Sequence, residues 1–166
     1  MRGIEIFHPL KSYWRALFHE QDKIPARSQF DPAQLKSILS HVYMTEQMPD
    51  GSYNLRHRGT GLENANRSAF ISTDHIQAYA KAKPGDLETY FDMLFKGPFA
   101  EESCWVYFSE DNDVIDYLCF SLPMYGKSYD HRIALGVLVA TNNFNPAMQK
   151  LCHGREYSIR KCSRYM

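Results

Sequence analysis

Three runs dense in strand-forming residues fill the last third of the chain, and short polar turns separate them. The runs cover residues 103–110, 114–124 and 131–141, and each is rich in Val, Ile, Leu, Tyr, Phe or Trp. The turns are Glu110-Asp111-Asn112-Asp113 and Tyr125-Gly126-Lys127-Ser128. Connections this short permit antiparallel pairing. The sequence therefore predicts a three-stranded antiparallel meander in this part of the chain.

A second pair of strands is predicted earlier in the chain. Residues 41–46 and 53–58 are rich in strand formers, and residues 48–52 between them contain the Pro-Asp-Gly-Ser run of a turn. These two segments are expected to form an antiparallel hairpin. Residues 32–40, 74–83 and 86–95 show helical spacing of apolar residues, and the Asp31-Pro32 pair is a helix-start signal.

An amphipathic helix is predicted from Pro9 onward. Its apolar residues fall at offsets 0, 3, 4, 7 and 8, on one helical face: Leu10, Tyr13, Trp14, Leu17 and Phe18. This face can cover one side of the sheet, and it can also meet a second copy of the chain in a homodimer. We therefore expect Tyr13, Trp14, Leu17 and Phe18 to contribute to an interface.

Two blocks of strands separated by helices favour an α+β fold. We expect a five-stranded antiparallel sheet with helices on one face and the amphipathic helix at the N-terminus. The predicted organisation is an N-terminal helix and lead-in at residues 1–31, a folded domain at 32–141 and a basic tail at 142–166. The tail is expected to be solvated, with contact to an acidic partner or membrane surface as the alternative.

The composition of the chain disfavours several classes of function. Lys plus Arg and Asp plus Glu number 19 each, so the basic excess typical of nucleic-acid binding is missing. No apolar run is long enough to span a bilayer, and we expect a cytoplasmic protein. The four cysteines, at 104, 119, 152 and 162, have no zinc or redox spacing and are expected to be reduced. No metal site is predicted.

Local residues point to a fold family. An N-terminal helix with a Trp, a Pro-x-Arg-Ser-x-x-Asp-Pro segment and a Leu-rich helix resemble the start of the bacterial single-domain PAS proteins. The matching residues are Trp14, Pro25, Arg27, Ser28, Asp31, Pro32, Leu35 and Leu39. Arg56, Gly59 and Thr60 are similar to the end of that family's second strand, and Ser121–Met124 is similar to the Leu-Pro-Leu end of its fourth.

The resemblance implies a non-catalytic sensory or regulatory module that binds a small ligand, a partner protein or both. Residues 64–71 lack the Gly-rich segment that the family tends to carry there, so no particular ligand is implied. Haem and flavin are the cofactors to consider, although no motif specifies either. The candidate ligand-binding residues are Tyr43, Leu55, His57, Tyr107 and Tyr117.

His57 occupies a position where the family carries an apolar residue. Alternate side chains of an extended strand share a face, so Tyr53, Leu55 and His57 are expected on one face and Arg56 and Arg58 on the other. His57 is then either hydrogen-bonded within the fold or in contact with a ligand or haem iron. The two arginines either cover the sheet or recognise an anion.

Two further functions stay open on the sequence alone. One is a small cone-fold enzyme of nuclear-transport-factor type, such as an isomerase or hydratase, which would use a pocket histidine beside a carboxylate. The other is an interaction scaffold without a ligand pocket. No cysteine or serine stands in a recognisable nucleophile motif, so no catalytic residue is predicted.

Overall fold

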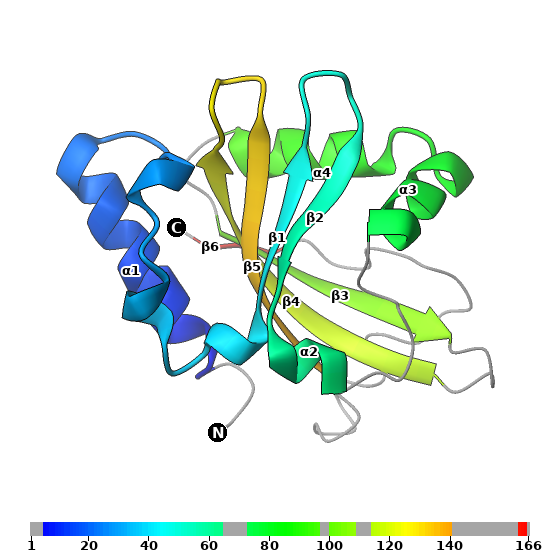
Figure 1. Ribbon diagram of the computed structural model, residues 1–166, viewed down its shortest axis with the longest axis horizontal. Coiled ribbons are helices and arrows are strands. Elements are labelled where there is room, and N and C mark those ends of the chain that lie inside the picture. Colours follow the sequence, from blue (N-terminus) through cyan, green and yellow to red (C-terminus); the bar gives the residue numbers. More distant parts are fainter. Residues whose placement is uncertain (1–4, 65–72, 97–99, 109–113, 141–162, 166) are drawn as a thin grey trace.

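A six-stranded antiparallel sheet organises the chain in the computed structural model, with helices on both of its faces (Figure 1). The strand order is β2-β1-β5-β4-β3-β6. The structure describes residues 5–64, 73–96, 100–108, 114–140 and 163–165, with backbone alone at 63–64, 75, 100–108, 114–118, 140 and 163–165.

The helices and strands follow in this order along the chain: α1 (Phe7–Gln21), the 3₁₀ turns η1 (Arg27–Gln29), η2 (Pro32–Leu35) and η3 (Leu39–His41), β1 (Val42–Gln47), β2 (Tyr53–Arg58), α2 (Thr60–Asn64), α3 (Thr73–Ala82), α4 (Asp86–Phe95), β3 (Ala100–Phe108), β4 (Val114–Tyr125), β5 (Arg132–Ala140) and β6 (Ser163–Tyr165).

Helix α1 packs on one face of the sheet. Its buried residues Phe7, Leu10 and Trp14 belong to a core that also contains Leu122 of β4 and Leu135 of β5. The Trp14 indole Nε1–H donates a 2.7 Å hydrogen bond to the Pro123 carbonyl, so the polar atom of this buried ring is satisfied. Both apolar packing and a specific bond therefore hold α1 on its own sheet.

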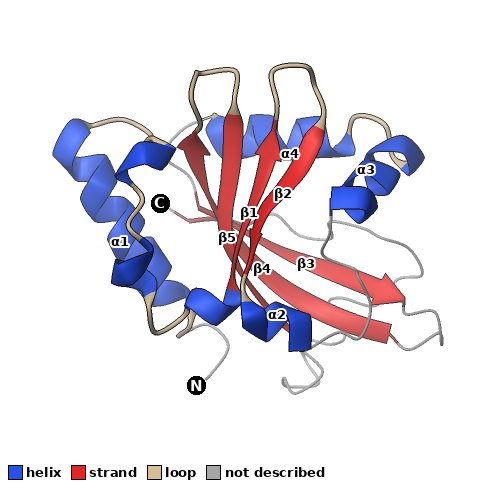
Figure 2. Cartoon of the chain, in the orientation of Figure 1, coloured by secondary structure: helices blue, strands red, loops and turns tan. Residues whose placement is uncertain are grey.

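Helices α3 and α4 cover the opposite face. Tyr79 of α3 and Leu87, Phe91 and Leu94 of α4 form a second buried core with sheet residues that include Tyr53. Figure 2 shows α4 passing behind the central strands, while α1 lies beside them. Arg132 fastens α4 at one point, because its guanidinium bonds Asp92 at 2.6 Å and lies over the rings of Phe91 and Phe95.

The lead-in between α1 and β1 runs beside the end of β4. Tyr125 N–H donates to the Pro25 carbonyl at 3.0 Å, and Ala26 forms a bridge with Tyr125. The Tyr13 hydroxyl accepts from Asp31 N–H at 2.6 Å and donates to the Gln29 carbonyl at 3.1 Å. These bonds place the lead-in next to the turn between β4 and β5 (Figure 1).

The α+β class and the antiparallel sheet agree with the sequence prediction, but the sheet has six strands rather than five. The sixth, Ser163–Tyr165, is too short and polar to give a strand pattern. The helix predicted at 32–40 is two 3₁₀ turns, although Asp31 caps as expected by accepting from Ala33 N–H. Ile38 interrupts them, with ψ near 0°.

Candidate functional site

The sheet face that carries α4 contains hydroxyl and thiol side chains within an apolar layer. Tyr43 comes from β1, Cys119 and Ser121 from β4, and Tyr90 from α4. We call these four residues the hydroxyl cluster. Tyr43 and Ser121 both stand opposite Gly136 of β5, and directly opposed residues share a face of a sheet. A Cβ at position 136 would overlap the Tyr43 ring, so glycine makes the room for it.

Tyr43 is the centre of the hydroxyl cluster. Its hydroxyl oxygen lies 2.6 Å from Ser121 Oγ and 2.7 Å from Cys119 Sγ. The Tyr90 hydroxyl donates to Ser121 Oγ at 2.7 Å, which links α4 to β4. Burial raises the pKa of Tyr43 well above its ordinary value, and interaction with Cys119 and Tyr90 raises it further. Tyr43 is therefore a neutral phenol at physiological pH.

The chemistry of the hydroxyl cluster suits hydrogen bonding rather than proton transfer. Its members are two phenols, a thiol and an alcohol, and none is a carboxylate, imidazole or amine. A general base works best with a pKa near the working pH, whereas the Tyr43 pKa is displaced upward. The cluster can accept and donate hydrogen bonds to a bound molecule, but it does not contain an acid–base pair.

The predicted position of His57 was wrong. The register skips Arg56: Met44 pairs with His57, whereas Thr45 pairs with Leu55, which is a β-bulge. His57 therefore shares the face of Met44, a member of the core under α1, rather than the face of Tyr53 and Leu55. The alternation rule failed because it assumes an unbroken strand. Arg58 pairs with Tyr43, so the two arginines do not share a face either.

His57 should make stability depend on pH. Burial lowers its pKa from the ordinary value of 6.5, and the Arg27 guanidinium lowers it further. The unfolded chain then binds the proton more readily than the folded one, so stability is full above that value and is lost as pH falls below it. Urea unfolding at about pH 8 and about pH 5.5 should show this loss, and His57→Leu should reduce it.

His8, an exposed histidine of α1, supplies the matched control for this experiment. His8→Asn should leave the difference between the two pH values as it is in the wild type. If His57→Leu and His8→Asn change the pH dependence equally, the attribution to His57 is wrong.

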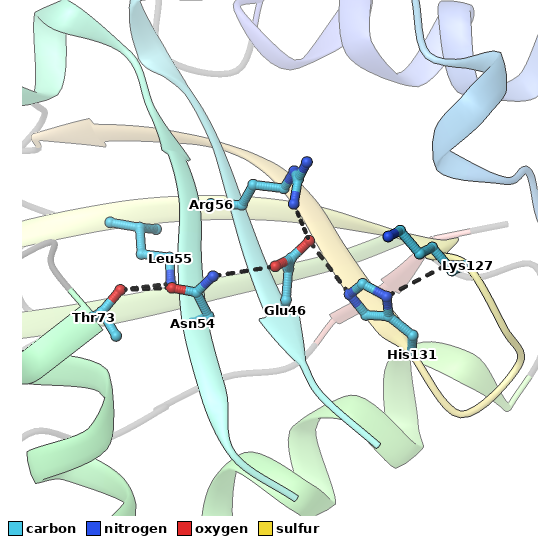
Figure 3. A network of polar contacts seen from close by, with 7 residues as sticks. All are labelled: Glu46, Asn54, Leu55, Arg56, Thr73, Lys127 and His131. Atoms are coloured by element: carbon cyan, nitrogen blue, oxygen red, sulfur yellow. Dashed lines mark hydrogen bonds and ion pairs between the residues drawn. The ribbon is translucent and has the colours of Figure 1, made fainter. Parts of the chain in front are cut away.

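A buried carboxylate, that of Glu46 in β1, lies on the face opposite the hydroxyl cluster, because its partner Ile133 belongs to the core under α1. Figure 3 shows Glu46 and its polar contacts. Glu46 is only 2% exposed, and three side chains converge on it. Asn54 donates to Glu46 Oε2 at 3.2 Å, while His131 Nε2 and Arg56 Nη1 lie 3.3 and 3.6 Å from Oε1. The backbone N–H of Lys127 donates to His131 Nδ1 at 3.3 Å, so Nε2 carries the proton that faces Glu46.

This carboxylate–histidine pair connects β1 to the turn between β4 and β5. Lys127 N–H donates to His131 Nδ1 and Asn54 donates to Glu46 Oε2, whereas His131 Nε2 and Glu46 Oε1 are buried 3.3 Å apart without hydrogen-bond geometry. Arg56 Nη1 adds an ion pair at 3.6 Å. The enzyme hypothesis required a pocket histidine beside a carboxylate, and the histidine expected there was His57. The buried carboxylate instead lies beside His131, where it fixes the turn between β4 and β5.

Of the other four predicted ligand residues, two can be assigned to a face of the sheet and two cannot. Tyr43 and Leu55 lie on the face that carries α4, because their partners Gly136 and Thr45 do. For Tyr107 of β3 and Tyr117 of β4 the structure describes the backbone alone. Sequence reasoning missed Tyr90, Cys119 and Ser121 as partners of Tyr43, since their polar atoms sit within apolar patterns that signal only a core.

The predicted interface residues of α1 differ in accessibility. Trp14 is 3% exposed and contacts its own sheet, and Tyr13 holds the lead-in. Leu17 is partly exposed, as is Phe18, which stacks on Trp14 with ring centroids 5.3 Å apart. A second copy of the chain can therefore reach Leu17 and Phe18, whereas Trp14 is already covered.

The described part of the chain contains neither a metal-binding cluster nor a membrane-spanning helix. Within it, no three side chains of the His, Cys, Asp or Glu type gather closely enough to hold a metal ion. The described helices also include none that is long and apolar enough to cross a bilayer.

Comparison with known proteins supports the architecture. The model of a protein family described as PAS domain matches residues 6–139, which is more than half of the chain. No curated protein matches the chain. The match runs from the start of α1 almost to the end of β5, so it includes α4 and the hydroxyl cluster, and β6 lies outside it. The chain belongs to the PAS domain family.

Proposed function

We propose that this PAS domain is a non-catalytic sensory or regulatory module that binds a small uncharged molecule between the sheet and α4. The hydroxyls of Tyr43, Ser121 and Tyr90 are its polar contacts. Membership of the PAS family supports a sensory or regulatory role in general.

One observation carries the proposal: polar groups from three separate elements converge in a layer that is otherwise apolar. The surrounding residues include Phe91 and Leu94 of α4 and Ala134 and Leu138 of β5, all buried. A buried hydroxyl without a partner costs free energy, so a fold gains little from placing four polar groups together in a core for packing alone. Such a group of directional contacts is typical of a binding site.

The hydroxyl cluster favours an uncharged ligand with a hydroxyl or carbonyl group and an apolar body. The burial that raises the pKa of Tyr43 penalises any negative charge at the same place, including a carboxylate or phosphate on a ligand. His57 cannot serve as a haem ligand in this site, because the register places it on the opposite face of the sheet.

Helix α4 is the element that would respond to such a ligand. It is tied to the sheet by the Tyr90–Ser121 hydrogen bond and by the bond between Arg132 and Asp92. The Tyr43 ring packs against Gly136, so a ligand that bonds Ser121 has to move Tyr43 or Tyr90. Replacing the Tyr90 bond would shift the balance between positions of α4, which is how a ligand changes a population.

Mass spectrometry of the purified protein tests the proposal. Under native conditions we expect a mass above that of the chain, and under denaturing conditions the mass of the chain alone. The double variant Tyr43→Phe/Ser121→Ala removes two hydroxyls and should reduce the bound fraction about tenfold or more, given about 1 kcal/mol or more for each hydrogen bond. Thr45→Ser, a conservative change elsewhere on β1, is the control.

The same spectra report the oligomeric state. A homodimer through Leu17 and Phe18 would appear as twice the mass, and Leu17→Asp should abolish it. A chain that stays an empty monomer at every concentration, with no mass change on addition of small alcohols and ketones, contradicts the ligand proposal. That result would favour an interaction scaffold whose core is filled.

A further inference from the structure

A groove lies at one end of the sheet, between the lead-in and the turn that joins β4 to β5. Its volume is about 330 Å³. The residues that line it come from the two segments Gln21–Gln29 and Tyr125–Tyr129. The bridge between Ala26 and Tyr125 holds the two walls together. The turn is held by a hydrogen bond from Lys127 N–H to His131 Nδ1. The walls are therefore preformed by contacts within the chain.

An exposed aromatic side chain borders this groove. Tyr129 is 78% exposed, although it is a large apolar ring. It packs edge-on against Tyr125 with centroids 4.9 Å apart, and Tyr125 contacts Phe95 of α4 at 5.1 Å. The ring is thus held in place while most of its surface faces solvent. Preorganised, exposed tyrosines are typical of residues that carry binding energy at protein interfaces.

The charges of the groove have one sign. Lys23 and Lys127 are the charged residues that line it, and both are exposed. Over the described ranges no carboxylate forms an ion pair with either ammonium group. Asp130, next to Tyr129, does not line the groove; its carboxylate keeps its negative charge and accepts a hydrogen bond from Ser128. The lining of the groove therefore offers two positive charges, neither in an ion pair within the described ranges, beside an aromatic surface, which complements carboxylates attached to an apolar group.

The shape of the groove favours a peptide over a small molecule. Its volume is at the lower limit for sites that enclose a ligand, about 300 Å³. An apolar side chain can occupy part of this volume while the neighbouring backbone continues past Lys23 on one side and Lys127 on the other. The amide of Gln29 adds a donor, because among the described residues only its oxygen has a partner, the N–H of Ala26.

We propose that this groove is a docking site for an acidic segment of a partner protein. An apolar side chain of the segment packs on Tyr125 and Tyr129, and flanking carboxylates face Lys23 and Lys127. The site shares no residue with the hydroxyl cluster, so it stands or fails independently of the proposed ligand site.

Fluorescence anisotropy with designed peptides tests the docking site. The probe is a fluorescein-labelled peptide with one Phe between pairs of Glu, and its matched controls replace every Glu by Lys or the Phe by Ala. We expect the Glu–Phe peptide to bind about tenfold or more tightly than either control, given about 0.2–1 kcal/mol for each exposed ion pair and more for the buried ring. Phenylacetate serves as the small-molecule competitor.

Protein variants assign the binding to the groove. Lys23→Glu/Lys127→Glu should reverse the preference between the Glu and Lys peptides, and Tyr129→Ser should weaken the Glu–Phe peptide about fivefold or more. Lys36→Glu changes an exposed lysine that does not line the groove and should leave both affinities unchanged. Circular dichroism melts confirm that each variant is folded.

Three results overturn the proposal. The first is equal affinity for the three peptides, or binding of none. The second is a preference for the Glu–Phe peptide that is unchanged both in Lys23→Glu/Lys127→Glu and in Tyr129→Ser. The third is that phenylacetate displaces the labelled peptide at the same concentration as the unlabelled peptide does, which would identify a small-molecule site.

Discussion

Trp14→Ala is expected to lower the free energy of unfolding by about 3–5 kcal/mol, the usual cost of truncating a buried tryptophan. Trp14 is 3% exposed, stacks on Phe18 and donates its indole N–H to the Pro123 carbonyl. The substitution removes the packing and leaves that carbonyl without its donor. Because whole domains are stable by about 5–15 kcal/mol, the loss should be obvious in a urea titration.

Two further variants separate the causes. Trp14→Phe keeps most of the packing and loses the hydrogen bond, so it should cost about 1–3 kcal/mol. Arg15→Ala changes the exposed neighbour and should stay within about 0.5 kcal/mol of the wild type. If Trp14→Ala and Arg15→Ala have the same small effect, α1 does not pack on the sheet of its own chain.

Gly136→Ala is expected to lower the free energy of unfolding by about 1–3 kcal/mol, the usual cost of adding a methyl group to a filled core. The new Cβ would overlap the end of the Tyr43 ring, which the hydroxyl cluster holds in place. Tyr43 must move, and its hydroxyl then leaves Ser121 and Cys119. The same variant should therefore weaken any ligand that bonds this cluster.

A double-mutant cycle tests whether the cost of Gly136→Ala comes from the overlap between the new Cβ and the Tyr43 ring. In a Tyr43→Leu background the shorter side chain leaves room, so adding Gly136→Ala should cost less than about 0.5 kcal/mol. Additive effects of the two substitutions would show that the ring of Tyr43 does not lie over Gly136.

Local patterns predicted most of the elements. The strand at 53–58 has the predicted bounds, and the helix predicted from Asp86 is α4, because the signals for both lie within a few residues. The sixth strand could not be predicted, since Ser163–Tyr165 gains its form from pairing with distant β3. The helix predicted at 32–40 is instead two 3₁₀ turns. Leu35 and Ile38 are both buried, and because residues three apart share one face in an α-helix as well, their spacing could not distinguish the two structures.

The site was predictable only in part. Tyr43 was a candidate from its strand, but its partners Tyr90, Cys119 and Ser121 are 47 or more positions away. Only the order of the strands and the packing of α4 on the sheet bring them together. The face of His57 depended on a bulge of one residue, which no propensity marks. Glu46 resembled an ordinary polar strand residue until the fold placed His131 beside it.

The most direct test of the proposed ligand site is a nuclear magnetic resonance titration of the isotope-labelled protein with small uncharged alcohols and ketones. If the hydroxyl cluster binds the ligand, saturable shifts should concentrate on the amides of Tyr43, Tyr90, Ser121 and Gly136, and Tyr43→Phe/Ser121→Ala should remove them. Shifts that gather elsewhere, or that persist unchanged in the double variant, would contradict ligand binding at the hydroxyl cluster.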